Sequence, residues 1–79
     1  MNNMKDLANI IRNRRGILNY TQMDMAELTG LTDRTIRSIE TGEHSTSIAS
    51  WLKVLNVLGL EMRIHFKPID DETRQGILQ

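Results

Sequence analysis

The sequence of 79 residues contains no cysteine, one proline, and one residue each of tryptophan, tyrosine and phenylalanine. Without cysteine the chain has no disulfide and no thiolate metal ligand, so neither can compensate for a small core. A chain of this length buries only about 60–65% of its unfolded surface, and dimerisation is the remaining common way to add buried area. We therefore expect a single domain that is stabilised by a second copy.

Long apolar runs and an excess of charge are also absent. No stretch approaches the ~20 apolar residues of a membrane span, and the N-terminus MNNMKDLANI lacks the pattern of a signal peptide. The expected location is a reducing, cytoplasmic one. Lys plus Arg and Asp plus Glu number 10 each, so the formal net charge is zero. This balance disfavours a general nucleic-acid binder but not a sequence-specific one.

Groups for catalysis and metal binding are sparse. The histidines His44 and His65 lie far apart without a third ligand, and no glycine-rich phosphate loop occurs. The acidic run of residues 70–72 lacks the spacing of a calcium loop. We expect no enzymatic activity, no metal site and no cofactor.

Residues 21–42, TQMDMAELTGLTDRTIRSIETG, have the pattern of two short helices joined by a tight turn. Thr21 and Thr32 are each placed to cap the start of a helix, and Gly30 supplies the positive φ that a left-handed break requires. Ala26 and Gly30 are small enough for the two helices to cross closely. That is the helix-turn-helix arrangement, in which the second helix enters the DNA major groove.

Two further helices are predicted around this motif. Residues 5–18 form the first, and Asn19 ends it in a left-handed conformation. Its buried stripe is expected to contain Leu7, Ile10, Ile11, Ile17 and Leu18. Ser47 caps a helix over residues 48–58, which is apolar nearly all round. We assign Ile48, Leu52 and Leu55 to the domain core, which leaves a second surface, for a twin subunit, formed by Trp51, Val54, Val57 and Leu58.

Residues 60–66, LEMRIHF, alternate between apolar and polar side chains, which predicts a half-buried strand. No second strand is predicted, and a lone strand leaves its backbone groups unpaired. Antiparallel pairing with the same strand of a second subunit would satisfy them, in a register centred on Met62. The apolar side of the strand adds four residues to the dimer interface: Leu60, Met62, Ile64 and Phe66.

The predicted fold is therefore mainly α, a compact four-helix domain plus one C-terminal β-strand that pairs across a dimer. Residues 1–66 make up the helix-turn-helix DNA-binding domain, which includes the dimerising strand 60–66. Residues 67–79 are expected to form a flexible C-terminal tail, because Pro68 ends the strand and the remainder is polar.

The sequence resembles the Xre/Cro-type repressor family. The resemblance rests on positions that agree in register over roughly residues 5–60, namely Thr21, Gln22, Ala26, Gly30, Thr32, Thr35, Ile36, Ile39, Glu40 and Gly42. The segment 60–66 is similar to the tail strand of HipB-type antitoxins. This likeness implies a homodimer that represses its own operon and binds a HipA-like kinase toxin. A stand-alone Xre-family regulator and an interaction module that has lost DNA binding remain open alternatives.

The resemblance also assigns contacts with double-stranded DNA at an inverted-repeat operator, at the bacterial nucleoid. Gln22 is expected at a phosphate. Arg34 is the best candidate for a bidentate contact to guanine. The other contacts on the recognition helix are assigned to Thr32, Asp33, Thr35, Arg37 and Ser38, and those of the following loop to His44, Ser45 and Thr46. Glu43, as an acid, is expected to point away.

Two local expectations concern packing. Arg15 and Glu40 align with an arginine and a glutamate that form an ion pair in phage repressors of this family, so we expect the same pair here. The second helix departs from the family pattern: either it rotates so that Leu28 packs, or Leu28 is an exposed anchor. Met25 is assigned to the core, and Met23 is left open between core filler and a partner-binding patch.

Overall fold

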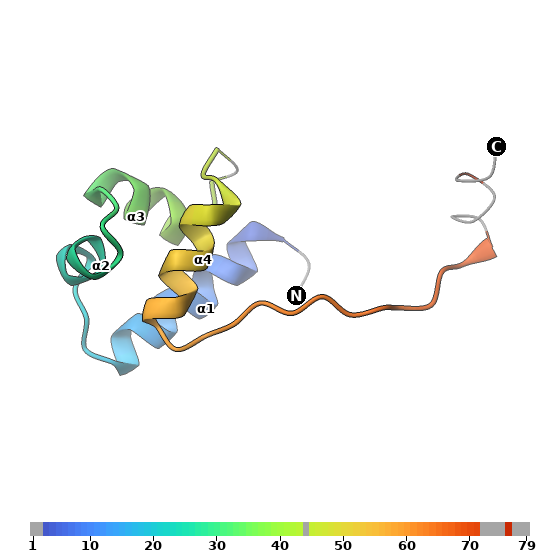
Figure 1. The fold of residues 1–79 in the computed structure, drawn as a ribbon, viewed down its shortest axis with the longest axis horizontal. Helices are drawn as coiled ribbons and strands as arrows, with labels where there is room; N and C mark the ends of the chain where they lie inside the picture. The colour runs from blue at the N-terminus through green and yellow to red at the C-terminus, as the bar shows by residue number, and fades with distance from the viewer. Residues whose placement is uncertain (1–2, 44, 72–75, 77–79) are drawn as a thin grey trace.

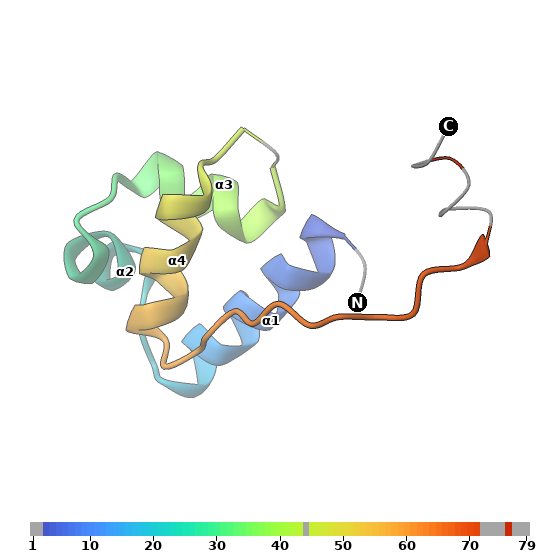
Figure 2. The ribbon, with the colours of Figure 1, turned by 45° about the vertical axis from the view of Figure 1, so that its right-hand side comes forward.

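The computed structural model describes residues 3–43, 45–71 and 76. This part of the chain contains four helices: α1 (Met4–Ile17), α2 (Gln22–Thr29), α3 (Asp33–Thr41) and α4 (Ile48–Val57). Helix α3 packs against α1, α2 and α4, and α2 also packs against α4 (Figure 1). The chain then leaves the helices as an extended segment, residues 61–70, which we call the arm (Figures 1 and 2). The predicted four-helix, mainly α fold is confirmed.

Each helix begins at a polar residue whose side chain accepts a hydrogen bond from a backbone N–H of the first turn. These residues are Asn3, Thr21, Thr32 and Ser47. At α2 the capping is reciprocal, because Asp24 donates its N–H to Thr21 Oγ1 at 3.0 Å and accepts the Thr21 N–H at 2.8 Å. The predicted caps at Thr21, Thr32 and Ser47 are confirmed.

The predicted left-handed residues are also present. Asn19 has a φ of 60°, and Gly30 has a φ of 75° at the end of α2. Gly42 ends α3 with a φ of 79°. The breaks at Asn19 and Gly30 separate the helices where the sequence predicts, and Gly30 brings the start of α3 shortly after the end of α2.

Gly42 is constrained by both its backbone conformation and its neighbours. A Cβ at this residue would lie 3.1 Å from the backbone of Met4 and Lys5, in the first turn of α1. We expect Gly42→Ala to lower the free energy of unfolding by about 1–3 kcal/mol, because α1 would have to move away from the end of α3. Urea denaturation followed by Trp51 fluorescence measures the change.

Gly16→Ala is the matched control for this prediction. Gly16 lies near the end of α1, and a Cβ there would meet nothing within 4 Å. This variant is expected to be neutral or to stabilise the protein by up to about 1 kcal/mol, since alanine favours the helix over glycine. Equal destabilisation by the two substitutions would contradict the role assigned to Gly42.

The core consists of apolar side chains from all four helices. Its buried residues are Ala8, Ile11, Met25, Ile36, Ile39, Trp51, Val54, Leu55 and Leu58. Met25 is completely buried, as predicted, whereas Met23 is 68% exposed and Leu28 is 55% exposed. Helix α2 therefore does not rotate to bury Leu28. Among the described residues, none of the helices combines the length and the hydropathy that crossing a membrane requires.

Helix α4 turns the opposite face to the core from the one that we predicted. Trp51, Val54 and Leu58 are 2%, 1% and 0% exposed, whereas Ile48 and Leu52 are 61% and 46% exposed. The assignment of Trp51, Val54 and Leu58 to a dimer surface is therefore wrong, because these side chains are already covered by their own chain. Val57 is partly buried and packs against the same core, and Leu55 is buried as predicted.

The buried stripe of α1 also differs from the prediction. Ile11 is buried, and Leu7 and Leu18 pack against the core, but Ile10 and Ile17 are 37% and 71% exposed. Ala8 is buried in their place, at 1% exposure. The face of α1 that becomes buried depends on the helices that pack against it, and not only on the periodicity of α1 itself.

Residues 60–66 form no strand with any other described part of the chain. Leu60 packs against the core and donates its N–H to the Leu55 carbonyl at 2.8 Å. Beyond it the arm first runs beside α1, where Met62 and Leu7 line the same hollow, and then extends away from the helices (Figure 2). Ile64 and Phe66 are 98% and 107% exposed. Pairing across a dimer stays a prediction.

Candidate nucleic-acid interface

Helices α2 and α3 meet across a turn of three residues, 30–32, in the geometry of a helix-turn-helix. Gly30 closes α2 by donating its N–H to the Ala26 carbonyl at 2.9 Å. On α3, Ile36 and Ile39 are buried in the core, at 1% and 0% exposure. The core therefore fixes the orientation of α3, and its other face is turned to solvent.

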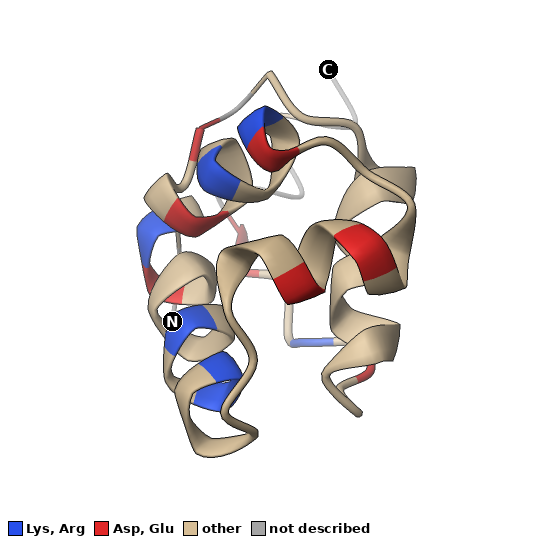
Figure 3. Cartoon of the chain, turned by 90° about the vertical axis from the view of Figure 1, so that its left-hand side faces the viewer, with Lys and Arg blue, Asp and Glu red and all other residues tan. Residues whose placement is uncertain are grey.

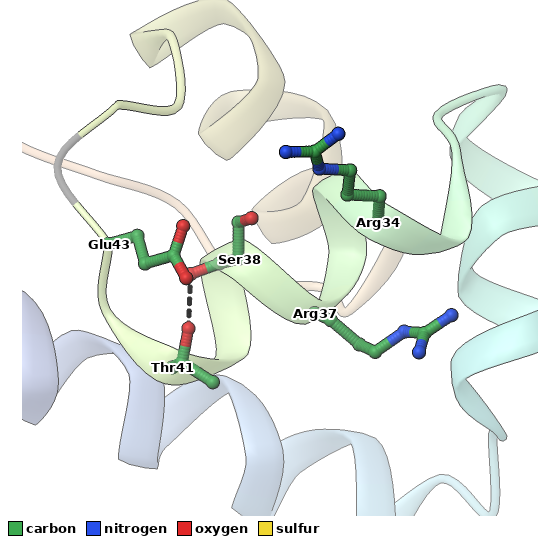
Figure 4. A pocket seen from close by; sticks show the side chains of 5 residues that line it. All are labelled: Arg34, Arg37, Ser38, Thr41 and Glu43. Carbon is green, nitrogen blue, oxygen red and sulfur yellow. Dashed lines mark hydrogen bonds between the residues drawn. The ribbon is translucent and has the colours of Figure 1, made fainter.

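The solvent face of α3 carries most of the predicted base-reading residues. A hollow of about 440 Å³ on this face is lined by Arg34, Arg37, Ser38, Thr41 and Glu43. Figure 4 shows Arg34 and Ser38 projecting on one side of the helix in that view, while Arg37 extends on the other. Both arginines are exposed, and neither forms a hydrogen bond or an ion pair with a described residue. Both guanidinium groups are therefore available to a ligand.

The first turn of α3 is held by its cap. Thr32 Oγ1 accepts the Thr35 N–H at 3.1 Å and lies 3.0 Å from the Thr35 hydroxyl. Thr32 and Asp33 are exposed, whereas Thr35 is partly buried. The two threonine hydroxyls are thus already engaged with one another in the free protein, and Asp33 is the acid nearest the start of the recognition helix.

Glu43 borders the same hollow, so the prediction that it points away is wrong. The reversal of the chain at Gly42 is the cause, because it allows the Glu43 N–H to donate to the Ser38 carbonyl at 3.0 Å. Thr41 Oγ1 donates to the same carbonyl at 3.0 Å (Figure 4). Of the loop residues that follow, Ser45 is exposed, Thr46 is partly buried, and His44 lies outside the described residues.

Glu40, at the end of α3, is buried at 3% exposure. Arg15 of α1 donates from Nε to Oε2 at 2.8 Å and from Nη2 to Oε1 at 3.0 Å, which is a bidentate ion pair. Arg15 also donates from Nη1 to the Tyr20 carbonyl at 2.9 Å, and Arg12 donates to the backbone carbonyl of Glu40. The predicted Arg15–Glu40 pair is confirmed.

Gln22, predicted to contact a phosphate, has a contact within the protein that sequence reasoning missed. Its Nε2 donates to Glu40 Oε1 at 3.3 Å. The side chain is partly buried and belongs to the first residue of α2. The pattern contained no signal for this bond, because residues 22 and 40 lie on different helices. Thr41, one turn after Arg37, was also missed, although that spacing could have placed it on the same face.

Charges of both signs occupy this side of the molecule. Figure 3 faces it and shows basic and acidic positions on neighbouring helices, with acidic positions alone on α2. The described residues contain no group of three or more His, Cys, Asp or Glu that could hold a metal ion. The net charge is zero, and among the described arginines Arg34 and Arg37 are the ones without a hydrogen bond or ion pair, so we expect the salt dependence of DNA binding to be modest.

A family model described as Helix-turn-helix matches residues 11–64, which is more than half of the chain. The chain therefore belongs to the Xre/Cro-type helix-turn-helix family, whose members are DNA-binding regulators and not enzymes. No curated protein matches it.

Solved structures that resemble the chain include those of HipB. Three of them are described as MDT Protein, a HipA-HipB-O2-O3 complex and a HipB-O4 20mer complex. Each has a TM-score of 0.76 and 25% sequence identity, and the alignment covers 86% of this chain and 96% of the other. The resemblance to HipB-type antitoxins is confirmed.

Proposed function

We propose that this protein is a dimeric, sequence-specific repressor, the antitoxin of a toxin–antitoxin operon. It binds an inverted-repeat operator in its own promoter and neutralises a HipA-like kinase toxin, in the cytoplasm at the nucleoid. The observation that carries the DNA-binding part is the solvent face of α3, where Arg34 and Arg37 are exposed and have no partner among the described residues. The similar structures of HipB, one of which includes HipA, support the antitoxin part.

In this mechanism α3 enters the major groove. Arg34 donates two hydrogen bonds to O6 and N7 of a guanine, and Ser38, one turn further, meets a neighbouring base edge. The side chain of Arg37 extends in a different direction from that of Arg34 (Figure 4), which suits a contact with the DNA sugar–phosphate backbone. Gln22 and the loop residues Ser45 and Thr46 hold phosphates. The bound dimer represses by blocking access of polymerase to the promoter.

Dimerisation through the arm would place two recognition helices about one helical turn, ~34 Å, apart on the operator. Ile64 and Phe66 have no packing partner among the described residues, and Ile48 and Leu52 of α4 are exposed as well. Glu61 and Arg63 form an ion pair at 2.7 Å, so these two polar side chains lie on the same side of the arm. Two arms paired side by side would satisfy the backbone groups that one chain leaves open.

Arg34→Ala tests the DNA-binding part of the proposal. Loss of a bidentate guanine contact should weaken binding to DNA from upstream of the gene by about 1–3 kcal/mol. Fluorescence anisotropy on that DNA and on a scrambled duplex measures the effect. Lys53→Ala is the matched control, because it removes one positive charge from an exposed position on α4 and should change binding little.

Equal, weak binding to both duplexes, unchanged in Arg34→Ala, would overturn the repressor function and favour a protein-interaction module. The antitoxin part has its own test, which is co-purification with the product of the neighbouring gene. If no kinase-like gene is adjacent and no toxin co-purifies, a stand-alone regulator is the function that remains.

A further inference from the structure

We propose that Glu40 is a positioning residue for DNA binding, which orients the side-chain amide of Gln22 toward a phosphate. The inference rests on the proposed DNA-binding function and adds a buried residue that itself touches no DNA. It joins two observations: Glu40 is 3% exposed, and its Oε1 accepts from Gln22 Nε2 at 3.3 Å.

The chemistry of the two groups fixes the orientation of the amide. An ionised carboxylate only accepts hydrogen bonds, so the NH2 group of Gln22 has to face Glu40 and its carbonyl oxygen has to lie on the other side. One N–H of the NH2 group is used by Glu40. The second N–H remains as a donor, and a phosphate oxygen, which only accepts, is a suitable partner for it.

Arg15 allows an acid to occupy this position next to a phosphate. An unpaired carboxylate would repel the phosphate, but Arg15 forms two hydrogen bonds with Glu40, at 2.8 Å and 3.0 Å. The pair carries no net charge, and yet Oε1 still accepts from Gln22. Because Arg15 is held in turn by the Tyr20 carbonyl, at 2.9 Å, the acceptor has a fixed place.

The start of α2 offers further donors at the same place. The reciprocal cap uses the N–H groups of Thr21 and Asp24. The N–H groups of Gln22 and Met23, in the first turn, have no backbone acceptor among the described residues. A phosphate at this helix end would meet these donors together with the amide that Glu40 orients.

This arrangement connects base reading with phosphate binding. Glu40 belongs to α3, which also carries Arg34, while Gln22 begins α2 and Arg15 belongs to α1. Glu40 thus links Gln22, the proposed phosphate-binding residue, to the recognition helix α3. We infer that the two sets of contacts reach the DNA in a fixed relative position, which favours the specific complex.

The experiment uses operator duplexes in which one phosphate at a time is replaced by a neutral methylphosphonate. In the wild type, each backbone position that the protein contacts should show weaker binding, and at the phosphate held by Gln22 the loss should be about tenfold, as expected for a hydrogen bond to a charged acceptor. Gln22→Ala should remove the penalty at that position. Glu40→Gln should also remove most of this penalty, since a glutamine at residue 40 can turn its NH2 toward Gln22. In the double variant Gln22→Ala, Glu40→Gln, the penalty at this phosphate should be no smaller than in Gln22→Ala alone.

Val54→Ala is the matched control for stability. Val54 is 1% exposed in the core and has no hydrogen bond with the Glu40 group, so this variant destabilises the fold while the penalty at the Gln22 phosphate should persist. If Glu40→Gln does not fold, Glu40→Asp can replace it, because the shorter acid keeps the negative charge that Arg15 needs but no longer reaches Gln22. The penalty at the Gln22 phosphate should again be lost.

A further readout needs no variant at residue 40. In the wild type, one side-chain N–H of Gln22 should exchange slowly by NMR in the free protein, and the second should slow only with operator bound. Equal exchange of the two protons, or a full penalty retained in Glu40→Gln, would overturn the positioning role. If the wild type shows no preference for upstream DNA, the proposed function fails instead, which is a distinct result.

Discussion

Arg15→Met is expected to remove about 3–5 kcal/mol from the free energy of unfolding, because it leaves the charge of Glu40 buried without its partner. Glu40 is 3% exposed, so water does not replace the two hydrogen bonds that Arg15 donates. The substitution also removes the bond to the Tyr20 carbonyl. The free energy of unfolding of native proteins is about 5–15 kcal/mol, so this loss would be a large part of the total stability.

The double variant Arg15→Met, Glu40→Leu is the control. It removes both charges and leaves apolar side chains of similar size, so most of the lost stability should return. Urea denaturation followed by the fluorescence of Trp51, the single tryptophan, measures each variant. A double variant as unstable as Arg15→Met would show that the unpaired acid is not the cause.

Phe66→Asp is expected to raise the dissociation constant of the proposed dimer by at least about 100-fold. Phe66 is 107% exposed in the single chain, and burying such a ring against a second copy contributes about 1.5–3 kcal/mol. The contact occurs twice in a symmetric dimer, and the aspartate adds the cost of covering a charge. Sedimentation equilibrium over a range of protein concentrations measures the change.

His65→Asp is the matched control, because His65 lies on the polar side of the alternation and its replacement should leave the dimer largely intact. The Phe66→Asp monomer should still bind a single half-site, and should lose the preference for the inverted repeat. A wild type that is monomeric at the concentrations where it binds DNA would contradict pairing through the arm.

The sequence alone determined the local features of this protein. The caps at Thr21, Thr32 and Ser47 each satisfy a backbone N–H within three residues, so their effect does not depend on the rest of the fold. The breaks at Asn19 and Gly30 likewise follow from their own backbone preferences. These signals, together with the buried Ile36 and Ile39, are sufficient to predict the helix-turn-helix and its solvent face.

The Arg15–Glu40 pair could be predicted because the resemblance to phage repressors carried a tertiary contact with it. By itself, the spacing of these residues in the chain contains no such signal. Gln22 and Glu40, which form the other contact, are 18 residues apart in the chain. The resemblance to the family did not imply a bond between them. It appears only when α2 is packed against the end of α3.

Tertiary structure also decided which apolar residues are buried. Helix α4 is apolar nearly all round, so its sequence is compatible with either face in the core, and packing selected Trp51, Val54 and Leu58. The turn at Gly42 brought Glu43 to the hollow on the solvent face of α3. Local hydrogen bonds are encoded by neighbouring residues, whereas burial depends on the shape of the elements that meet, and that shape exists only in the folded chain.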